Sequence, residues 1–248
     1  MLNENTASRS ICLPTCNVCT PNLARRSLLT GLAAASILPR AFAADAPAAP
    51  APNAISGEAA LHRLMAGNAR HAADQPDRRD FNAGRVARAK AQYPIATVLG
   101  CADSRVGPEF VFDQGPGELF VVRVAGNVLT EEGTASLEYA AQDLGVPLIL
   151  VLGHSSCGAV AAAIKSAEDT TKLPGHLPEL IAKITPAVTA TQSAPPSSRL
   201  SDAIAENVRL TKQQITASAP VLSAMVVSGK VKVAGGVYDL ATGKVRLL

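Results

Sequence analysis

The chain has 248 residues, of which 48% are apolar and 17% are charged, so it can bury a core and is not a disordered chain. Aromatic residues make up only 3% and Trp is absent, so Ala and the aliphatic side chains must do most of the packing. The formal net charge of +3 is carried entirely by residues 1–43. Because the remaining residues are balanced in charge, there is no electrostatic case for nucleic-acid binding.

Residues 1–43 are predicted to be an export signal peptide. Arg25 and Arg26 precede a modest apolar run over residues 28–38, and residues 41–43, Ala-Phe-Ala, have the pattern of a cleavage site. The run is shorter than the roughly 20 residues that span a bilayer, so no stable membrane insertion is expected once the leader is removed. The paired arginines favour twin-arginine export, with an ordinary secretory leader as the alternative. We therefore expect a periplasmic or otherwise exported protein.

The five cysteines fall into two groups. Cys12, Cys16 and Cys19 lie in the leader and are expected to be removed with it, which leaves Cys101 and Cys157 in the mature chain. Two cysteines in an oxidising compartment ordinarily indicate a disulfide, but the motifs that surround this pair indicate a different use.

Residues 44–55 are rich in Ala and Pro, lack apolar periodicity, and are predicted to be a tether. We expect one domain over residues 56–248, in which Ser56 is the N-cap of the first helix. Further helices are expected over residues 84–92, 131–144, 157–168, 176–190 and 201–218. Apolar runs that are too short for helices predict buried strands over residues 95–100, 119–124, 147–152 and 231–238.

This alternation of strands and helices predicts an α/β fold. Its centre is a mostly parallel β-sheet, flanked by helices on both faces. A turn over residues 238–243, followed by residues 244–248, predicts a hairpin that closes one edge of the sheet.

Reactive residues follow two of the predicted strands. Residues 95–100 run directly into Cys101, and residues 147–152 lead to His154 and Cys157. Ligand sites of open parallel sheets form beyond the carboxyl ends of the strands, so the three side chains converge if these two strands are neighbours. Two thiolates and one imidazole are a tetrahedral zinc set, which leaves the fourth position for water or substrate.

An ionisable pair, Asp103 and Arg105, lies just beyond Cys101. Such a pair is costly at a strand end unless it is paired and used. Arg105 is expected to hold Asp103 ionised, so that the carboxylate either accepts a proton from metal-bound water or takes the fourth metal position itself. Three alternatives stay open for Cys101, His154 and Cys157: ordinary core residues, a structural zinc site that lacks its fourth ligand, or, without metal, a disulfide.

The motifs Cys-Ala-Asp-Ser-Arg over residues 101–105 and His-x-x-Cys over residues 154–157 resemble the signature of the β-class carbonic anhydrases. The resemblance runs from about residue 57 to the end of the chain. It includes Gly-Glu-Leu-Phe over residues 117–120 and Arg-x-Ala-Gly-Asn over residues 123–127. One departure is Val124, which stands where the family usually has Asn.

The resemblance implies one Zn²⁺ per chain, held by Cys101, His154 and Cys157. It makes Asp103 and Arg105 the catalytic dyad beside the ion. The implied activity is the reversible hydration of CO2 to bicarbonate and a proton, by attack of zinc-bound hydroxide on CO2.

The resemblance also implies membership of a plant-like subgroup with an open CO2 pocket. Its substrate-binding residues match Gln92, Phe120, Tyr139 and Gly158. The other subgroup uses a Trp in an inhibitory bicarbonate pocket, and this chain has no Trp. The family's subunits usually pair and share pocket residues across the interface, so a homodimer or a higher homo-oligomer is expected.

Two other functions stay open on the sequence alone. One is hydrolysis of a related linear substrate such as CS2 or COS, and the other is a zinc-binding scaffold without activity. His62, His71 and His176 are either proton relays or ordinary surface histidines.

Overall fold

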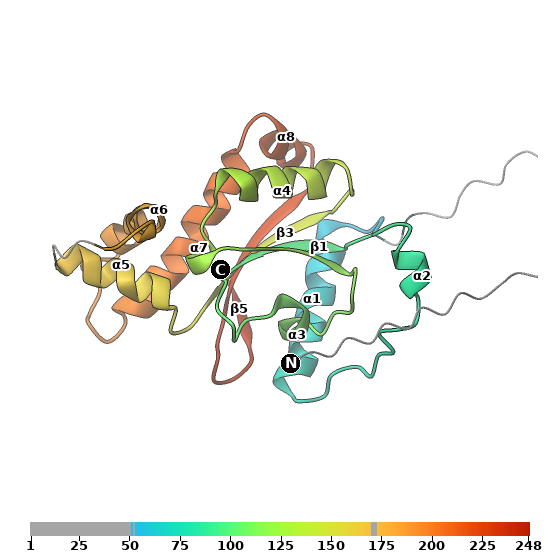
Figure 1. Ribbon diagram of the computed structural model, residues 1–248, viewed down its shortest axis with the longest axis horizontal. Coiled ribbons are helices and arrows are strands. Elements are labelled where there is room, and N and C mark those ends of the chain that lie inside the picture. The colour runs from blue at the N-terminus through green and yellow to red at the C-terminus, as the bar shows by residue number, and fades with distance from the viewer. Residues whose placement is uncertain (1–50, 52, 170–172) are drawn as a thin grey trace, which may run out of the picture. The chain divides into compact units, whose positions relative to one another are not determined.

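The computed structural model describes residues 51, 53–169 and 173–248 (Figure 1). The predicted signal peptide, with Cys12, Cys16 and Cys19, lies outside the described residues. The elements in chain order are α1 (Gly57–Ala72), α2 (Arg85–Arg88), β1 (Ala96–Gly100), α3 (Pro108–Val111), β2 (Leu119–Arg123), the 3₁₀ turn η1 (Ala125–Asn127), α4 (Glu131–Gln142), β3 (Leu148–His154), α5 (Gly158–Glu168), α6 (Leu177–Ala190), α7 (Arg199–Ala217), α8 (Val221–Val227), β4 (Lys232–Tyr238) and β5 (Val245–Leu247).

The five strands form one sheet in the order β2-β1-β3-β4-β5. The first four strands are parallel, and β5 pairs antiparallel with β4 in the predicted hairpin. The α/β fold with a mostly parallel central sheet is therefore confirmed. β1 and β3 are hydrogen-bonded neighbours, with Gly100 opposite Leu152. This pairing is the condition under which the reactive residues that follow the two strands converge.

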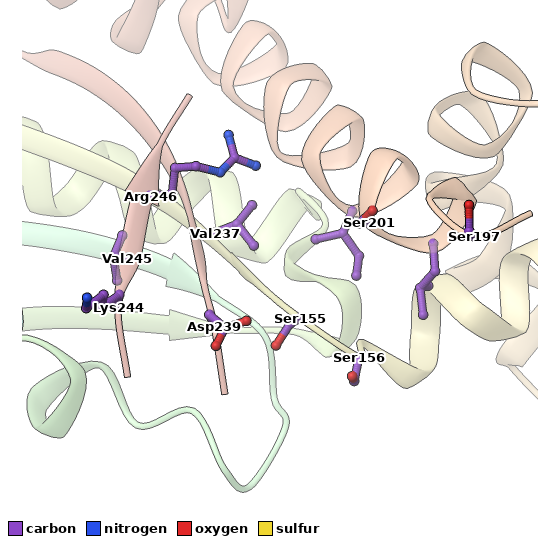
Figure 2. A pocket seen from close by; sticks show the side chains of 11 residues that line it. Ser155, Ser156, Ser197, Ser201, Val237, Asp239, Lys244, Val245 and Arg246 are labelled. Atoms are coloured by element: carbon purple, nitrogen blue, oxygen red, sulfur yellow. The ribbon is translucent and has the colours of Figure 1, made fainter. Parts of the chain in front are cut away.

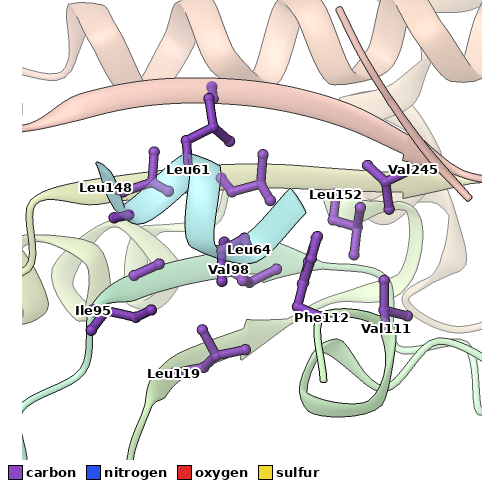
Figure 3. Packing of buried hydrophobic residues seen from close by; sticks show 14 of the residues in the cluster. Leu61, Leu64, Ile95, Val98, Val111, Phe112, Leu119, Leu148, Leu152 and Val245 are labelled. Carbon is purple, nitrogen blue, oxygen red and sulfur yellow. The ribbon is translucent and has the colours of Figure 1, made fainter. Parts of the chain in front are cut away.

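Side chains alternate between the two faces of β3 and build a core on each. Leu148, Leu150 and Leu152 pack on one face with residues of α1, and Figure 3 shows Leu61 and Leu64 of that helix over the sheet. Ile149 and Val151 face the other way and pack with residues of α4, α7 and α8. Helices therefore cover both faces.

The chain leaves β1 and β3 in opposite directions across the sheet. From β1 it passes to β2 on one side, and from β3 it passes to β4 on the other side. In open parallel sheets, ligands bind in the crevice outside the carboxyl ends of strands at such a switch point. The topology thus selects the carboxyl ends of β1 and β3 as the place for a site.

Two sequence predictions need correction. The helix expected over residues 84–92 is only the single turn α2, because none of its residues is buried and no packing extends it.

The packed body also begins before Ser56. Asn53, expected in the tether, is buried and donates a hydrogen bond from Nδ2 to the Leu144 carbonyl at 2.7 Å. Ser56 itself is the N-cap of α1, as predicted, and its Oγ accepts from the Ala59 amide at 3.1 Å.

The short helices α3 and α8 were not predicted. Both begin at a proline: Pro108 is the first residue of α3, and Pro220 is the N-cap of α8. Within the part of the chain that the structure describes, no helix is both long enough and apolar enough to cross a membrane.

Candidate metal centre

Three potential metal ligands meet where β1 and β3 end. Cys101 follows β1 directly, His154 is the last residue of β3, and Cys157 is the N-cap of α5. Their ligand atoms all lie within 4.8 Å of one another, and all three residues are buried. Both cysteines are free thiols. The structure thus brings the predicted set together, and in this state it does not form the alternative disulfide.

A tight turn between His154 and Cys157 aims both residues at the same point. Ser156 has a positive φ of 55°, a left-handed conformation that reverses the chain just before Cys157. Ser155 ties the turn to β4, because its amide donates to the Tyr238 carbonyl at 2.8 Å and its Oγ accepts from the Leu240 amide at 2.9 Å. The two ligands are therefore held at the carboxyl end of the sheet and not on a free loop.

The hydrogen bonds of His154 leave one ring nitrogen available for a metal. Nδ1 lies 2.9 Å from the Ser155 carbonyl, which fixes Nδ1 as the protonated donor and Nε2 as the lone-pair nitrogen of the neutral ring. Nε2 is buried and has no hydrogen-bond partner in the described structure. A buried polar atom without a partner is costly, and coordination of a cation removes that cost.

The two thiols share a site that suits one negative charge in the absence of metal. A hydrogen bond from the Cys157 thiol lowers the pKa of Cys101 to about 4 against the opposing effect of burial. The same hydrogen bond, together with burial, raises the pKa of Cys157. Burial opposes protonation of His154, but the Cys101 sulfur and the Asp103 carboxylate outweigh it and raise the pKa of His154. A metal must displace these protons, so its affinity should increase with pH.

Backbone amides also hold the Cys101 sulfur. The Gly126 amide lies 3.2 Å from Sγ and the Asp103 amide 3.4 Å from it. Gly126 has a φ of +71°, and a Cβ at this position would lie 2.6 Å from Ile184 Cδ1, so any other residue would be strained here. The buried Asn207 of α7 donates from Nδ2 to the Gly126 carbonyl at 2.7 Å. The Arg-x-Ala-Gly-Asn motif was the only sequence signal for this support, and nothing in the sequence indicated Asn207.

The Asp103 carboxylate is held from one side by Arg105. Oδ1 accepts from the Arg105 amide at 3.0 Å and from Nε at 2.9 Å, and Oδ2 accepts from Nη2 at 2.7 Å. The forked hydrogen bond from the guanidinium keeps the pKa of Asp103 far below its usual range. Oδ2 lies 3.8 Å from His154 Nε2, so an ionised carboxylate borders the Cys–His–Cys cluster, as the sequence led us to expect.

The donor set fits zinc. Two sulfurs and one imidazole nitrogen are typical zinc ligands, and three of them leave a fourth position free. The lone-pair nitrogen of His154 and the two adjacent free thiols are the observations that support this fit.

Three of the four predicted substrate-binding residues lie away from this cluster within one chain. Gln92 is exposed and precedes β1, whereas Cys101 follows it, and the five-residue strand between them is roughly 15 Å long. Phe120 lies near the start of the edge strand β2, and its ring centroid is 6.2 Å from that of Tyr139 on α4. Only Gly158, the first residue of α5, adjoins the metal ligands.

The candidate proton relays do not belong to the cluster either. His62 and His176 are exposed. His71, at the end of α1, lies 3.0 Å from the Tyr238 hydroxyl through its Nε2. These contacts are typical of surface and structural histidines.

Val124, the departure from the family pattern, packs partly buried against the apolar cluster that contains Cys101 and Cys157. Its amide donates to the Gly100 carbonyl at 3.1 Å and so continues the pairing of β2 with β1. No ligand is lost through this change.

A pocket of about 690 Å³ lies next to the Ser155–Ser156 turn (Figure 2). Ser197, just before α7, and Ser201, in its first turn, line the pocket, and Arg246 lines it from β5. Neither the Cys–His–Cys cluster nor Asp103 contributes to its wall.

These observations define a class of protein: an α/β sheet protein with a buried Cys–His–Cys metal centre at its topological switch point. Residues 96–245 match the family model described as carbonic anhydrase. A carbonic anhydrase of Mycolicibacterium smegmatis is 38% identical over 190 residues, which cover 76% of this chain and 92% of that relative. Carbonic anhydrase 2 of Mycobacterium tuberculosis is 37% identical over 187 residues, which cover 75% of this chain and 90% of that relative.

Solved structures agree with these matches. The Coccomyxa β-carbonic anhydrase in complex with acetazolamide is 28% identical with a TM-score of 0.60, and the match covers 67% of this chain and 77% of that one. A tetrameric β-carbonic anhydrase of Sordaria macrospora shares the fold with a TM-score of 0.61 at 22% identity, over 77% of this chain and 94% of that one. The chain belongs to the β-class carbonic anhydrase family.

Proposed function

We propose that this protein catalyses the reversible hydration of CO2 to bicarbonate and a proton, with one zinc ion held by Cys101, His154 and Cys157. The observation that carries the proposal is the buried Cys–His–Cys cluster with an ionised carboxylate at its border. A zinc ion held by these residues would lower the pKa of a bound water and so supply hydroxide near neutral pH. Membership of the carbonic anhydrase family supports the same reaction.

The chain's own residues orient the reactants. Asp103 stays ionised because Arg105 binds both of its carboxylate oxygens, so the carboxylate would accept a hydrogen bond from a water at the fourth metal position and orient it. Arg105 is 54% exposed at its side chain and Asp103 only 17%, so the guanidinium covers the carboxylate from the solvent side. The Gly126 amide stabilises the negative charge on the Cys101 sulfur.

Stopped-flow measurement of CO2 hydration by the zinc-loaded mature chain tests the proposal. Hydration far above the buffer rate, with one zinc per chain, is the expected result. A zinc-loaded protein without hydration would overturn the proposal. CS2 and COS are then the next substrates to assay, and a scaffold role follows if these are also inert.

We also propose that the protein works as a homodimer or a multiple of it, in the plant-like manner, with Gln92, Phe120 and Tyr139 of one subunit completing the pocket of the other. These residues gather near the edge strand β2, whose outer side pairs with no other strand of the described sheet, and at the amino ends of β1 and β2. Tyr139 is 48% exposed, and the edge strand carries the apolar run of residues 119–122. Exposed aromatic side chains beside an open, apolar strand edge are typical of an interface.

Mixing an inactive variant with a strongly impaired one tests the shared pocket. Cys157→Ser removes a metal ligand, and Gln92→Ala removes a pocket residue. In a mixed dimer, the Gln92→Ala chain keeps its own metal ligands and receives Gln92 from its partner, so one site becomes complete. We expect about one quarter of wild-type activity after subunit exchange, because random pairing makes half of the dimers mixed. No recovery after verified exchange would show that Gln92 acts within its own chain.

We further propose that the mature enzyme is exported by the twin-arginine pathway. The support is in the sequence: paired arginines, a short and weakly apolar run, and an Ala-Phe-Ala cleavage site at residues 41–43. This route carries folded proteins, so zinc would be loaded in the reducing cytoplasm before Cys101 and Cys157 meet an oxidant. Replacing Arg25 and Arg26 by Lys together should abolish export while zinc content is retained. Unchanged export would indicate an ordinary secretory leader.

A further inference from the structure

Arg123, the last residue of the edge strand β2, reaches across to the loop that carries the first metal ligand. It lies opposite Gly100 in the register of β1 with β2, directly beside the point where β1 ends. Its Nε donates to the Cys101 carbonyl at 2.9 Å, and its Nη2 donates to the Asp103 carbonyl at 2.6 Å. One guanidinium therefore bridges both ends of the segment that joins a metal ligand to the carboxylate.

Arg123 gives the two carbonyls a donor from outside their own loop. The parallel ladder of β1 stops at Gly100, so the sheet no longer supplies donors to the carbonyls of the loop that follows. The Asp103 carbonyl also accepts from the Val106 amide at 3.1 Å, but that bond lies within the same loop. Arg105 likewise binds Asp103 from inside the loop. Arg123 supplies the side-chain contact that ties the backbone of residues 101–103 to the neighbouring strand.

The geometry needs arginine in particular. Its planar guanidinium presents Nε–H and Nη–H donors in a fixed fork, whereas a lysine ammonium cannot hold two acceptors in a set relative position. The fork fixes the spacing of two carbonyl groups that flank Ala102. Since the Cys101 sulfur and the Asp103 carboxylate belong to these two residues, the fork restricts the backbone from which both side chains extend.

We propose that Arg123 is a positioning residue of the metal centre: by holding the carbonyls of Cys101 and Asp103, it sets the Asp103 carboxylate at its working distance from the metal ligands. The role in turnover rests on the proposed carbonic anhydrase activity. The role in metal binding does not, because it concerns only the orientation of Cys101. Groups that support the first ligands of a metal typically change metal affinity or activity 10- to 100-fold when they are removed.

The test compares Arg123→Gln and Arg123→Lys with a matched control, Arg209→Gln. Arg209 lies on α7, and its guanidinium pairs with Glu206 one turn away on the same helix. The measurements are the zinc dissociation constant by competition with a chromophoric chelator, kcat and KM on zinc-replete protein, and the pH profile of kcat. Circular dichroism and thermal unfolding report whether each variant is folded.

For Arg123→Gln we expect zinc affinity to fall about tenfold, kcat to fall 10- to 100-fold with KM little changed, and the pH profile of kcat to shift. Arg123→Lys should recover little of this loss, because it restores the charge but not the fork. Arg209→Gln should match the wild type in every measurement. Wild-type zinc affinity, kcat and pH profile in Arg123→Gln would overturn the proposal, and so would full rescue by lysine.

Two further outcomes are also decisive. If Arg123→Gln does not fold, Arg123→Lys alone decides, since it keeps the aliphatic stem and the positive charge. If the wild-type protein hydrates no CO2, the proposed function fails, but an unchanged zinc affinity in the variants would still be needed to reject the positioning role.

Discussion

The carboxyl and amino ends of the parallel strands differ in whether one chain alone assembles the predicted site residues. At the carboxyl ends of β1 and β3, one chain brings together three buried metal ligands and, at their border, the more exposed Asp103–Arg105 ion pair. At the amino ends of β1 and β2, Gln92 and Tyr139 are exposed on the surface next to an open strand edge. The contrast separates a metal cluster that one chain assembles by itself from substrate residues that, in the proposed dimer, a second subunit would bring to it.

The largest effect should come from breaking the carboxyl-end site. Cys157→Ser replaces a thiolate ligand by a hydroxyl, which zinc binds poorly, so we expect loss of bound zinc and CO2 hydration at the buffer rate. Zinc content by atomic absorption and stopped-flow hydration check this prediction. Ser156→Ala, at the exposed neighbouring position, is the control. Retention of one zinc per chain with normal activity in Cys157→Ser would show that the cluster is not the active metal site.

Breaking the other end should separate substrate handling from metal binding. Gln92→Ala is expected to keep one zinc per chain but to lose about 10- to 100-fold in kcat/KM, because a hydrogen-bond donor to the substrate oxygens is removed. The exposed Gln213 of α7 provides the control variant Gln213→Ala. A Gln92→Ala protein with wild-type kcat/KM would remove this residue from the pocket and weaken the contrast between the two ends.

Two glycines beside the metal ligands, Gly153 and Gly158, test how tightly the carboxyl end of the sheet is packed. A Cβ at Gly153, next to His154 on β3, would lie 2.6 Å from Val208 Cγ2 of α7, so Gly153→Ala should destabilise the fold by about 1–3 kcal/mol. Gly158→Ala is the matched control for stability, because an added Cβ there meets nothing within 4 Å. Urea unfolding of both variants checks this prediction. Equal stability of the two variants would mean that the backbone next to His154 can shift to accept the added Cβ, although it packs closely against α7.

Ion pairs hold the segment that leads to Gln92, and this makes that end sensitive to acid. Asp113 accepts from Arg70 Nε at 2.5 Å and from the Asp77 amide at 3.1 Å, while Arg79 pairs with Glu118. Burial raises the pKa of Asp113, but the bonds to Arg70 and Asp77 outweigh it, and the net pKa is lowered. The stability that Asp113 contributes is therefore present above its unfolded pKa of about 3.9 and is lost as the pH falls through the lower folded value.

Asp113→Asn should accordingly cost about 2 kcal/mol at pH 7, with a cost that shrinks towards zero in acid. Urea unfolding at a series of pH values measures this, with Asp143→Asn at the exposed end of α4 as the control. A cost that does not depend on pH would assign the effect to packing and not to the charge.

The sequence predicted the fold well where periodicity and capping are strong. Ser56 correctly predicted the start of α1. The short apolar runs predicted β1 to β4, because a buried parallel strand needs little more than a run of aliphatic residues. The parallel-sheet rule also led to Cys101, His154 and Cys157, since strand ends carry the ligands. The same rule does not predict contacts between residues that are distant in sequence and meet only through tertiary packing. Asn207 is 81 residues from Gly126, and only the docking of α7 makes them partners.

Other failures have local reasons. Residues 84–92 have good helix formers, but propensity alone does not sustain a helix without a buried face, so only Arg85–Arg88 is helical. The prediction that Gln92, Phe120 and Tyr139 belong to the pocket came from resemblance. Spacing along the chain cannot say which of two subunits a residue serves, and the structure of one chain shows only that these residues are not beside their own metal ligands.

The separation of the ligands along the chain also has a consequence for folding. Cys101 follows β1, whereas His154 ends β3 and Cys157 follows it, and the chain between β1 and β3 forms α3, β2, η1 and α4. Closing so long a loop costs conformational entropy, which the contacts made by the intervening strand and helix must offset. An ion that needs all three donors can bind tightly only after β1 and β3 have paired, so metal uptake is a late event and the rate of zinc capture during refolding reports the joining of the two strands.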